Sequence, residues 1–122
     1  MKLYYNWRGH GNIGMKKWGN IISNRKRHGR ILEFNIDIEY AWDLYVKQKG
    51  YCALTSLPID FSNNHNELGT ASLDRIDSAY GYVHDNVWWL HKDINRMKWT
   101  FTVDKFLELC KLIISNQGNK HE

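Results

Sequence analysis

Side chains that could bind a metal ion or a phosphate are concentrated in residues 72–99 (SLDRIDSAYGYVHDNVWWLHKDINRMKW). Asp74 stands next to Arg75, and Asn95 follows Asn86 by nine positions, across a hydrophobic run. Carboxylate and amide oxygens are ligands that Mg²⁺ and Mn²⁺ prefer. Arg and Lys side chains in the same segment could bind phosphate. These residue types therefore indicate a candidate site for a metal ion or a phosphate.

Three elements must position these side chains. Residues 71–76 and 87–91 have the composition of strands, and a polar segment rich in Gly and Tyr connects them. Residues 92–99 predict a short helix that follows directly. Trp88 and Trp89 point to opposite faces of their strand, so only one of them is expected in the core. The predicted order is β–loop–β–α.

Two helices are expected before this unit. The first covers residues 15–28, ends at Gly29 as its C-cap, and buries Trp18, Ile21 and Ile22. The second begins after Asp37 as its N-cap and stops at Gly50. Its apolar face is predicted to consist of Ile38, Ala41, Trp42, Tyr45 and Val46.

A hairpin and a final helix complete the predicted elements. Residues 51–61 (YCALTSLPIDF) predict a small hairpin held by Tyr51, Leu54 and Leu57, followed by a solvated loop. Thr102 is the expected N-cap of a C-terminal helix that reaches residue 116, with a frayed tail after it. The apolar side of that helix is predicted to consist of Phe106, Leu107, Leu109, Cys110, Ile113 and Ile114.

Length and composition favour one globular α+β domain over residues 1–122, of which 43% are hydrophobic. We expect a basic N-terminal segment (1–36), a hairpin plus ββα core (51–99) and a C-terminal helix (102–116). No apolar run approaches the ~20 residues of a membrane span, and the N-terminus lacks the apolar region of a signal peptide. The two Cys suggest buried free thiols in a reducing compartment. The expected location is the cytoplasm, that of the host cell if the gene is phage-encoded.

Positive charge is concentrated at the N-terminal end. Residues 1–30 contain eight Lys and Arg and no Asp or Glu, although the whole chain has a net charge of only +4. Such a segment suits a polyanionic partner, because neutralised phosphates release counterions. A solvated basic helix face is the alternative interpretation. Trp7, Trp18 and Tyr80 lie in basic or loop surroundings and are candidates for stacking on bases.

The segments LDRID, DNVWW and KDINRMK resemble the first strand, the loop with the second strand, and the helix of the HNH, or ββα-metal (His-Me finger), nucleases. The similarity extends over residues 34–114 and is closest to small phage-type members. It implies a ββα-metal core preceded by a β-hairpin and flanked by N- and C-terminal helices. It also implies an endonuclease that cleaves DNA, expected to be double-stranded, by nicking or by double-strand cleavage, and leaves 5′-phosphate and 3′-hydroxyl ends.

The resemblance assigns roles to individual residues. Asp74 and Asn95 would hold one Mg²⁺ or Mn²⁺ ion, and Asn86 would brace the loop through hydrogen bonds to backbone. Many members carry C-x-x-C pairs that bind zinc, but this chain has a single Cys at the first such place, Cys52, so no structural zinc is expected. The DNA backbone would be contacted by Lys16, Lys17, Arg25, Lys26, Arg27, Arg30, Arg96 and Lys98.

One position departs from the family. Arg75 occupies the place of the general-base His, and a guanidinium is a poor proton acceptor. His91, Asp77 or His84 could activate water instead, and His91 is retained as a candidate catalytic residue. Arg75 could alternatively stabilise the phosphate, or catalysis could be weak, because a lost base costs ~10²–10⁴ in rate. The alternative function is a non-catalytic DNA-binding module with the same fold.

Overall fold

The computed structural model describes residues 9–27, 29–61 and 69–121. Within these ranges the protein is a small α+β structure with four helices and two two-stranded antiparallel sheets. The elements in chain order are α2 (Met15–Ser23), β1 (Lys26–Arg27), β2 (Arg30–Ile31), α3 (Ile38–Lys47), β3 (Ala71–Arg75), β4 (Val87–His91), α4 (Lys92–Lys98) and α5 (Val103–His121). No helix among the described residues is both long and apolar enough to cross a membrane.

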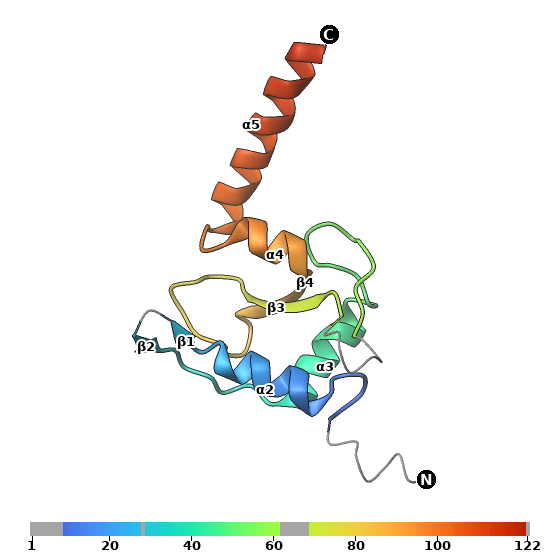
Figure 1. Cartoon of the computed structure of the whole chain (residues 1–122), viewed down its shortest axis with the longest axis vertical. Helices are drawn as coiled ribbons and strands as arrows, with labels where there is room; N and C mark the ends of the chain where they lie inside the picture. The colour runs from blue at the N-terminus through green and yellow to red at the C-terminus, as the bar shows by residue number, and fades with distance from the viewer. Residues whose placement is uncertain (1–8, 28, 62–68, 122) are drawn as a thin grey trace.

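The β3–loop–β4–α4 order predicted for the central segment is confirmed, with β3 one residue shorter than expected. β3 and β4 pair antiparallel, so Asp74 lies opposite Trp88 and Ala71 lies opposite His91. In Figure 1, α4 lies on one side of this strand pair and α3 on the other. The two faces of the small sheet are therefore covered by different helices.

The core is centred on β4, whose alternation separates the two neighbouring tryptophans. Trp89 is fully buried, its Nε1 donates to the carbonyl of Ala41 on α3, and its ring packs edge-on against Phe61. Trp88 is only partly buried and faces the α4 side. The prediction that one of the pair belongs to the core is confirmed, because side chains alternate across a strand.

Residues 51–61 form a looser hairpin than the sequence predicted. One β-bridge joins Tyr51 to Pro58, and the side chains of Tyr51 and Leu57 are 47% and 46% exposed. The expectation that these two residues hold the hairpin is therefore wrong. Cys52, Ile59 and Phe61 are buried in their place. The backbone of the segment also bonds to β4, because Ala53 N donates to Trp89 O. The loop expected next falls largely on residues 62–68, outside the described residues.

The N-terminal helix is shorter than predicted. α2 ends at Ser23 rather than at residue 28, although Trp18 and Ile21 are buried as expected. The chain then forms the β1–β2 hairpin, in which Gly29 adopts a φ of 77° and Leu32 N donates to Arg25 O at 2.7 Å. Glycine takes this left-handed conformation without a Cβ clash, so it favours the turn over further helix. Gly29 is thus a hairpin residue and not a helix cap.

The loop between β3 and β4 supports the segment that follows this hairpin. Tyr82 N donates to Glu33 O at 2.8 Å, and Asn35 N donates to Tyr82 O at 3.1 Å. Gly81 lets the two backbones meet, because a Cβ at this position would lie 2.2 Å from Glu33 O. These contacts place the β1–β2 hairpin beside the β3–β4 loop, although the two are about fifty residues apart in sequence.

α3 follows its prediction with one exception. The carboxylate of Asp37 accepts a hydrogen bond from Tyr40 N at 2.8 Å, which confirms the N-cap. Ala41 is fully buried, and Trp42 and Tyr45 stack on each other against the core. Val46, expected on the apolar face, is 54% exposed, because Ala41 and Gln48 contact β4 and Val46 does not share their side of the helix.

α5 differs most from expectation. Thr102 Oγ1 accepts from Lys105 N, which confirms the cap, but the helix continues to His121 instead of fraying after residue 116. In Figure 1 it projects away from the rest of the molecule. Phe106 is buried, whereas half of the predicted apolar side is solvent-exposed, with Leu107, Ile113 and Ile114 at 45%, 59% and 73%. Cys110 is likewise only partly buried.

Candidate functional site

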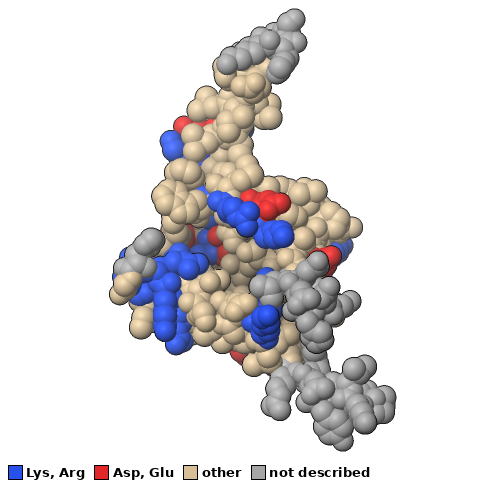
Figure 2. Space-filling model, in the orientation of Figure 1, with Lys and Arg blue, Asp and Glu red and all other residues tan. Residues whose placement is uncertain are grey.

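A cleft of about 610 Å³ lies between the β1–β2 hairpin, β3, the β3–β4 loop and α4. Among the residues that the structure describes, Asp74 is the one acidic residue that lines it. Its cationic lining residues are Arg27, Arg30, Arg75, Lys92 and Arg96. Figure 2 shows Lys and Arg over the β1–β2 hairpin and over α4, on two sides of a hollow. The cleft thus combines strong positive charge with a single carboxylate.

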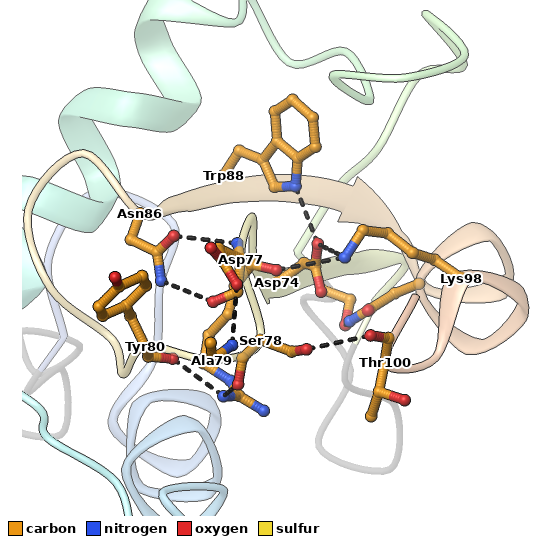
Figure 3. A network of polar contacts seen from close by, with 12 residues as sticks. Asp74, Asp77, Ser78, Ala79, Tyr80, Asn86, Trp88, Lys98 and Thr100 are labelled. Carbon is orange, nitrogen blue, oxygen red and sulfur yellow. Dashed lines mark hydrogen bonds and ion pairs between the residues drawn. The ribbon is translucent and has the colours of Figure 1, made fainter. Parts of the chain in front are cut away.

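Asp74 is held by two donors from different elements. The carboxylate is buried, and its Oδ2 accepts from Trp88 Nε1 at 2.9 Å and from Lys98 Nζ at 3.0 Å. Figure 3 shows both side chains reaching it. Lys98 is fully buried and also donates to the carbonyl of Arg75 at 3.2 Å. Among the described residues, Oδ1 of Asp74 has no hydrogen-bond partner, so it is the oxygen available to a ligand in the cleft.

Asn95 lies on the same interface as Asp74. Its Nδ2 donates to Ser72 Oγ at 2.7 Å, and both residues line the cleft. Ser72 and Asp74 are two positions apart on β3 and share a face of the strand. Asn95 and Lys98 are three positions apart on α4 and share a face of the helix. The structure therefore brings the two predicted metal ligands to one β3–α4 interface at the cleft.

Arg75 is anchored by the loop that follows β3. Its Nη1 donates to the carbonyl oxygens of Ser78 at 2.6 Å and Tyr80 at 2.9 Å, and its guanidinium lies over the Tyr82 ring. A hydrogen bond from Ser78 Oγ to Thr100 O ties the same loop to the chain after α4. The guanidinium is consequently fixed at the wall of the cleft, with its other two nitrogens free of partners within the described chain.

Asn86 makes the loop-bridging hydrogen bonds that the sequence predicted. Its Oδ1 accepts from Asp77 N at 3.0 Å, while its Nδ2 donates to Asp77 O at 3.1 Å and to Gly81 O at 2.9 Å. Figure 3 shows the Asn86 amide beside Asp77. Asn86 thereby closes the loop that carries the partners of Arg75, and it does not itself line the cleft.

The three residues considered as alternative bases lie outside the cleft lining. Nδ1 of His91 accepts from Asp93 N and caps α4, so the ring is engaged at the start of that helix. The ring of His84 stacks on Tyr40, with centroids 4.1 Å apart. The Asp77 carboxylate accepts from Ala79 N at 2.9 Å within its own turn. The expectation that His91 belongs to the catalytic group is not supported by its position, because capping α4 directs its ring elsewhere.

The predicted DNA-contacting cations separate into three groups. Arg27, Arg30 and Arg96 are exposed and line the cleft, whereas Lys16 and Lys26 are exposed elsewhere on the surface. The remaining three are partly or fully buried within the protein: Lys17, Arg25 and Lys98.

The burial of these three cations corrects the prediction that they contact the DNA backbone. Lys17 is part-buried and donates to Ala71 O on β3, and burial, with a smaller contribution from Lys92, lowers the pKa of its ammonium. Nε of Arg25 is buried without a partner among the described residues. Lys98 is fully buried against Asp74, so it cannot reach a DNA backbone outside the protein.

Sequence reasoning missed two cationic or aromatic residues of the cleft lining and the ion-pair partner of Asp74. Lys92 begins α4 and was treated only as a helix residue, and Trp99 follows α4 at the cleft wall. Lys98 was missed as the partner of Asp74. Its position three residues after Asn95 was the available signal, because that spacing puts both side chains on one helix face. Of the stacking candidates, Trp18 is buried and Trp7 lies outside the described residues.

A cation in this cleft would be held by oxygen atoms. Within the part of the chain that the structure describes, no group of three or more His, Cys, Asp or Glu side chains is placed to bind a metal. The protein ligands would be the carboxylate of Asp74 and the neutral oxygens of Asn95 and Ser72. Oxygen donors of this kind match the preference of Mg²⁺ and Mn²⁺, which retain several waters when bound.

Comparison of the chain with protein-family models, with curated proteins and with solved structures gave no match in any of the three. The geometry and charge of the cleft, and the resemblance of residues 72–99 to HNH nucleases, are the features that bear on function.

Proposed function

We propose that this protein is an endonuclease of the HNH type that hydrolyses DNA phosphodiester bonds with the help of one divalent cation. The observation that carries the proposal is that Asp74 and Asn95, selected from the sequence as metal ligands, line one cleft with five cationic side chains. If Asp74 and Asn95 had no common role, we would not expect them to line the same cation-rich cavity.

The charge of the cleft supports a phosphate-bearing substrate. Five cationic side chains and a single carboxylate among the described lining residues leave the cleft strongly positive. Lys and Arg arranged in this way attract a polyanion and position its backbone without reading its sequence. Two of the five, Arg27 and Arg30, come from the basic N-terminal segment. Part of the positive charge of that segment therefore lies at the cleft.

The oxygen atoms of the cleft fit a hard cation. Asp74 Oδ1 and Asn95 Oδ1 have no partners within the described chain, and Ser72 Oγ lies beside Asn95. When bound, Mg²⁺ or Mn²⁺ would polarise the phosphoryl oxygen and stabilise the leaving 3′ oxygen. Trp88 and Lys98 fix the other carboxylate oxygen of Asp74, which holds this ligand in one orientation.

Arg75 is assigned to charge stabilisation at the phosphate. The loop carbonyls bind only Nη1, so Nη2 and Nε remain available for a phosphate oxygen at the cleft wall. A guanidinium fixed in place suits this role because it forms strong charge-assisted hydrogen bonds with phosphate. The lining residues that the structure describes include no His, and Arg75 stands where the HNH family has its general base. Loss of a positioned base predicts a low turnover rate.

A non-catalytic DNA-binding module is the second candidate, and one observation favours it. The ammonium of Lys98 already neutralises Asp74 at 3.0 Å, so the carboxylate has a permanent cationic partner without a metal. The same charged cleft would then bind a DNA backbone and leave it intact.

Cleavage of supercoiled plasmid in the presence of Mg²⁺ or Mn²⁺ tests the proposal. The wild-type protein should convert the plasmid to nicked or linear form, and EDTA should stop the reaction. Asn95→Ala should lose most of the activity, while Met97→Ala serves as the matched control because Met97 is exposed on the same helix outside the cleft lining. Circular dichroism verifies that both variants fold. Plasmid binding without cleavage by the wild type would favour the second candidate.

A further inference from the structure

Trp99 combines an exposed ring with an unusual backbone conformation. It follows α4 directly, its side chain is 68% exposed, and it lines the cleft. Its φ is 52° and its ψ is −125°. A bulky side chain in this left-handed region is a genuine outlier, since the Cβ crowds the backbone. The fold thus holds a large aromatic ring in solvent at a position where Gly would avoid the strain.

The backbone around Trp99 is held on both sides. Trp99 N donates to the carbonyl of Asn95 at 3.1 Å, and the carbonyl of Thr100 accepts from Ser78 Oγ at 3.0 Å. Its ring meets Phe101 edge-on, with centroids 5.9 Å apart. Strained backbone of this kind persists where the surroundings fix it, and it is characteristic of ligand-binding positions. The hydrogen bonds account for the backbone conformation, but they give no reason for an indole at this residue.

The neighbours of Trp99 in the cleft are those expected of a nucleotide site. Arg30, Arg96 and Asp74 line the same cavity, so a phosphate bound by the arginines would share that cavity with the ring. Inside a duplex, both faces of each base are covered by adjacent base pairs. An unpaired base has free faces, and aromatic rings beside a cationic groove bind such bases by stacking.

We propose that Trp99 is a stacking platform for an unpaired nucleobase next to the phosphate bound in the cleft. The substrate class that follows is DNA with unpaired nucleotides, either a single strand or a duplex opened at the bound position. This inference rests on the proposed function for the binding of nucleic acid in the cleft, and it adds the kind of DNA and the residue that selects it.

Binding of two single-stranded oligonucleotides in EDTA tests the proposal, because no metal-dependent cleavage occurs there. One strand carries bases, and the other has the same phosphates but an abasic sugar at every position. Stacking of one base changes affinity by about 5- to 150-fold. The wild type should prefer the intact strand by a factor in this range. Fluorescence anisotropy of labelled strands gives both affinities.

Variants at position 99 separate a stacking role from a structural one. Trp99→Gly should bind both strands equally and should melt at a higher temperature than the wild type, because Gly relieves the strain. Trp99→Phe should keep part of the preference. Met97→Ala is the control, since Met97 is 57% exposed on the same helix but does not line the cleft, and its base preference should match that of the wild type.

The outcomes distinguish this inference from the proposed function. A wild type that binds the two strands equally, or a Trp99→Gly variant that keeps the preference, overturns the stacking role alone. A wild type that binds neither strand overturns both the stacking role and the cleft as a DNA site. Loss of the preference in Trp99→Gly, with binding of the abasic strand unchanged, supports the inference.

Discussion

The buried ion pair between Lys98 and Asp74 allows a quantitative prediction. Lys98 Nζ lies 3.0 Å from Asp74 Oδ2, and the two side chains are 0% and 8% exposed. At this separation two unit charges attract by about 5–6 kcal/mol at an effective dielectric constant of about 20. Removing one member of a buried pair costs about 3–5 kcal/mol, because the other charge loses its partner. Lys98→Met keeps most of the side-chain volume, so little of that loss should come from a cavity.

Urea unfolding of a double-mutant cycle measures this coupling. Lys98→Met and Asp74→Asn should each lose about 3–5 kcal/mol, whereas the double variant should lie within about 2 kcal/mol of the wild type, since neither charge is left alone. Lys105→Met is the control, because Lys105 is exposed and lies 3.9 Å from Glu108. It should cost less than about 1 kcal/mol. Additive losses in the double variant would refute the coupling.

The same variants report on the metal site. The Lys98 ammonium repels a second cation at the Asp74 carboxylate, so its removal should strengthen divalent binding. Mn²⁺ should therefore raise the unfolding midpoint more in Lys98→Met than in the wild type, and EDTA should reverse the shift. The double variant, which lacks the carboxylate, should show no shift. Equal shifts in all three proteins would mean that Mn²⁺ binds away from Asp74.

Three further predictions follow from the cleft and its supports. Replacing Arg27 and Arg30 together with Ala should lower the slope of log affinity against log salt on duplex DNA by roughly 1.8 units, as measured by anisotropy. Asn86→Ala should destabilise the protein by about 1–3 kcal/mol in urea unfolding, because three loop hydrogen bonds are lost. Burial lowers the pKa of Lys17, so the unfolded chain binds more protons between the lowered pKa and 10.5, and raising the pH through this range should stabilise the wild type relative to Lys17→Met.

Further measurements test whether the salt slope depends on the cleft and whether the pH dependence comes from Lys17. Lys16 and Lys26 are exposed cations outside the cleft lining, so replacing both with Ala should change the salt slope less than replacing Arg27 and Arg30. An equal change would mean that the charge acts as a diffuse surface and the cleft has no special part. A stability difference between the wild type and Lys17→Met that stays constant up to pH 10 would contradict the cost assigned to burial of the Lys17 ammonium.

Features that depend on residues close together in the sequence were predicted well. Asp37 and Thr102 act as N-caps as expected, because a cap depends on hydrogen bonds within the first turn of its own helix. β4 was predicted with its observed bounds, since turn residues precede it and a run of β-formers defines it. Asp74 and Asn95 were assigned to one site through the resemblance of their segments to HNH nucleases, and both line the same cleft.

Features that depend on distant contacts were missed. Residues 15–28 have a helical pattern throughout, but pairing of Arg25 with Leu32 and the left-handed Gly29 divert the chain into a hairpin after Ser23. Lys98 looks like a surface cation at a helix end, and its burial depends on a carboxylate 24 residues earlier in the sequence. Neither the hairpin nor the ion pair is visible in the spacing of one segment.

The C-terminal helix shows a different limit of sequence patterns. Its apolar side was inferred from helical spacing, which indicates which residues share a face but not whether another element covers it. Phe106 near the start of the helix is buried, while Ile113 and Ile114 further along it are exposed to solvent. The Leu and Ile spacing was therefore informative about the helix and uninformative about its burial.

Cleavage by the charge-neutral variant tests the central claim most directly. Asp74→Asn combined with Lys98→Met removes the proposed metal-binding carboxylate without leaving a buried charge, so a folded protein can be compared with the wild type. In a plasmid assay with Mn²⁺, the wild type should produce nicked or linear DNA and the double variant should leave the plasmid supercoiled. A double variant that cleaves as fast as the wild type, or a wild type that cleaves equally in EDTA, would contradict the account.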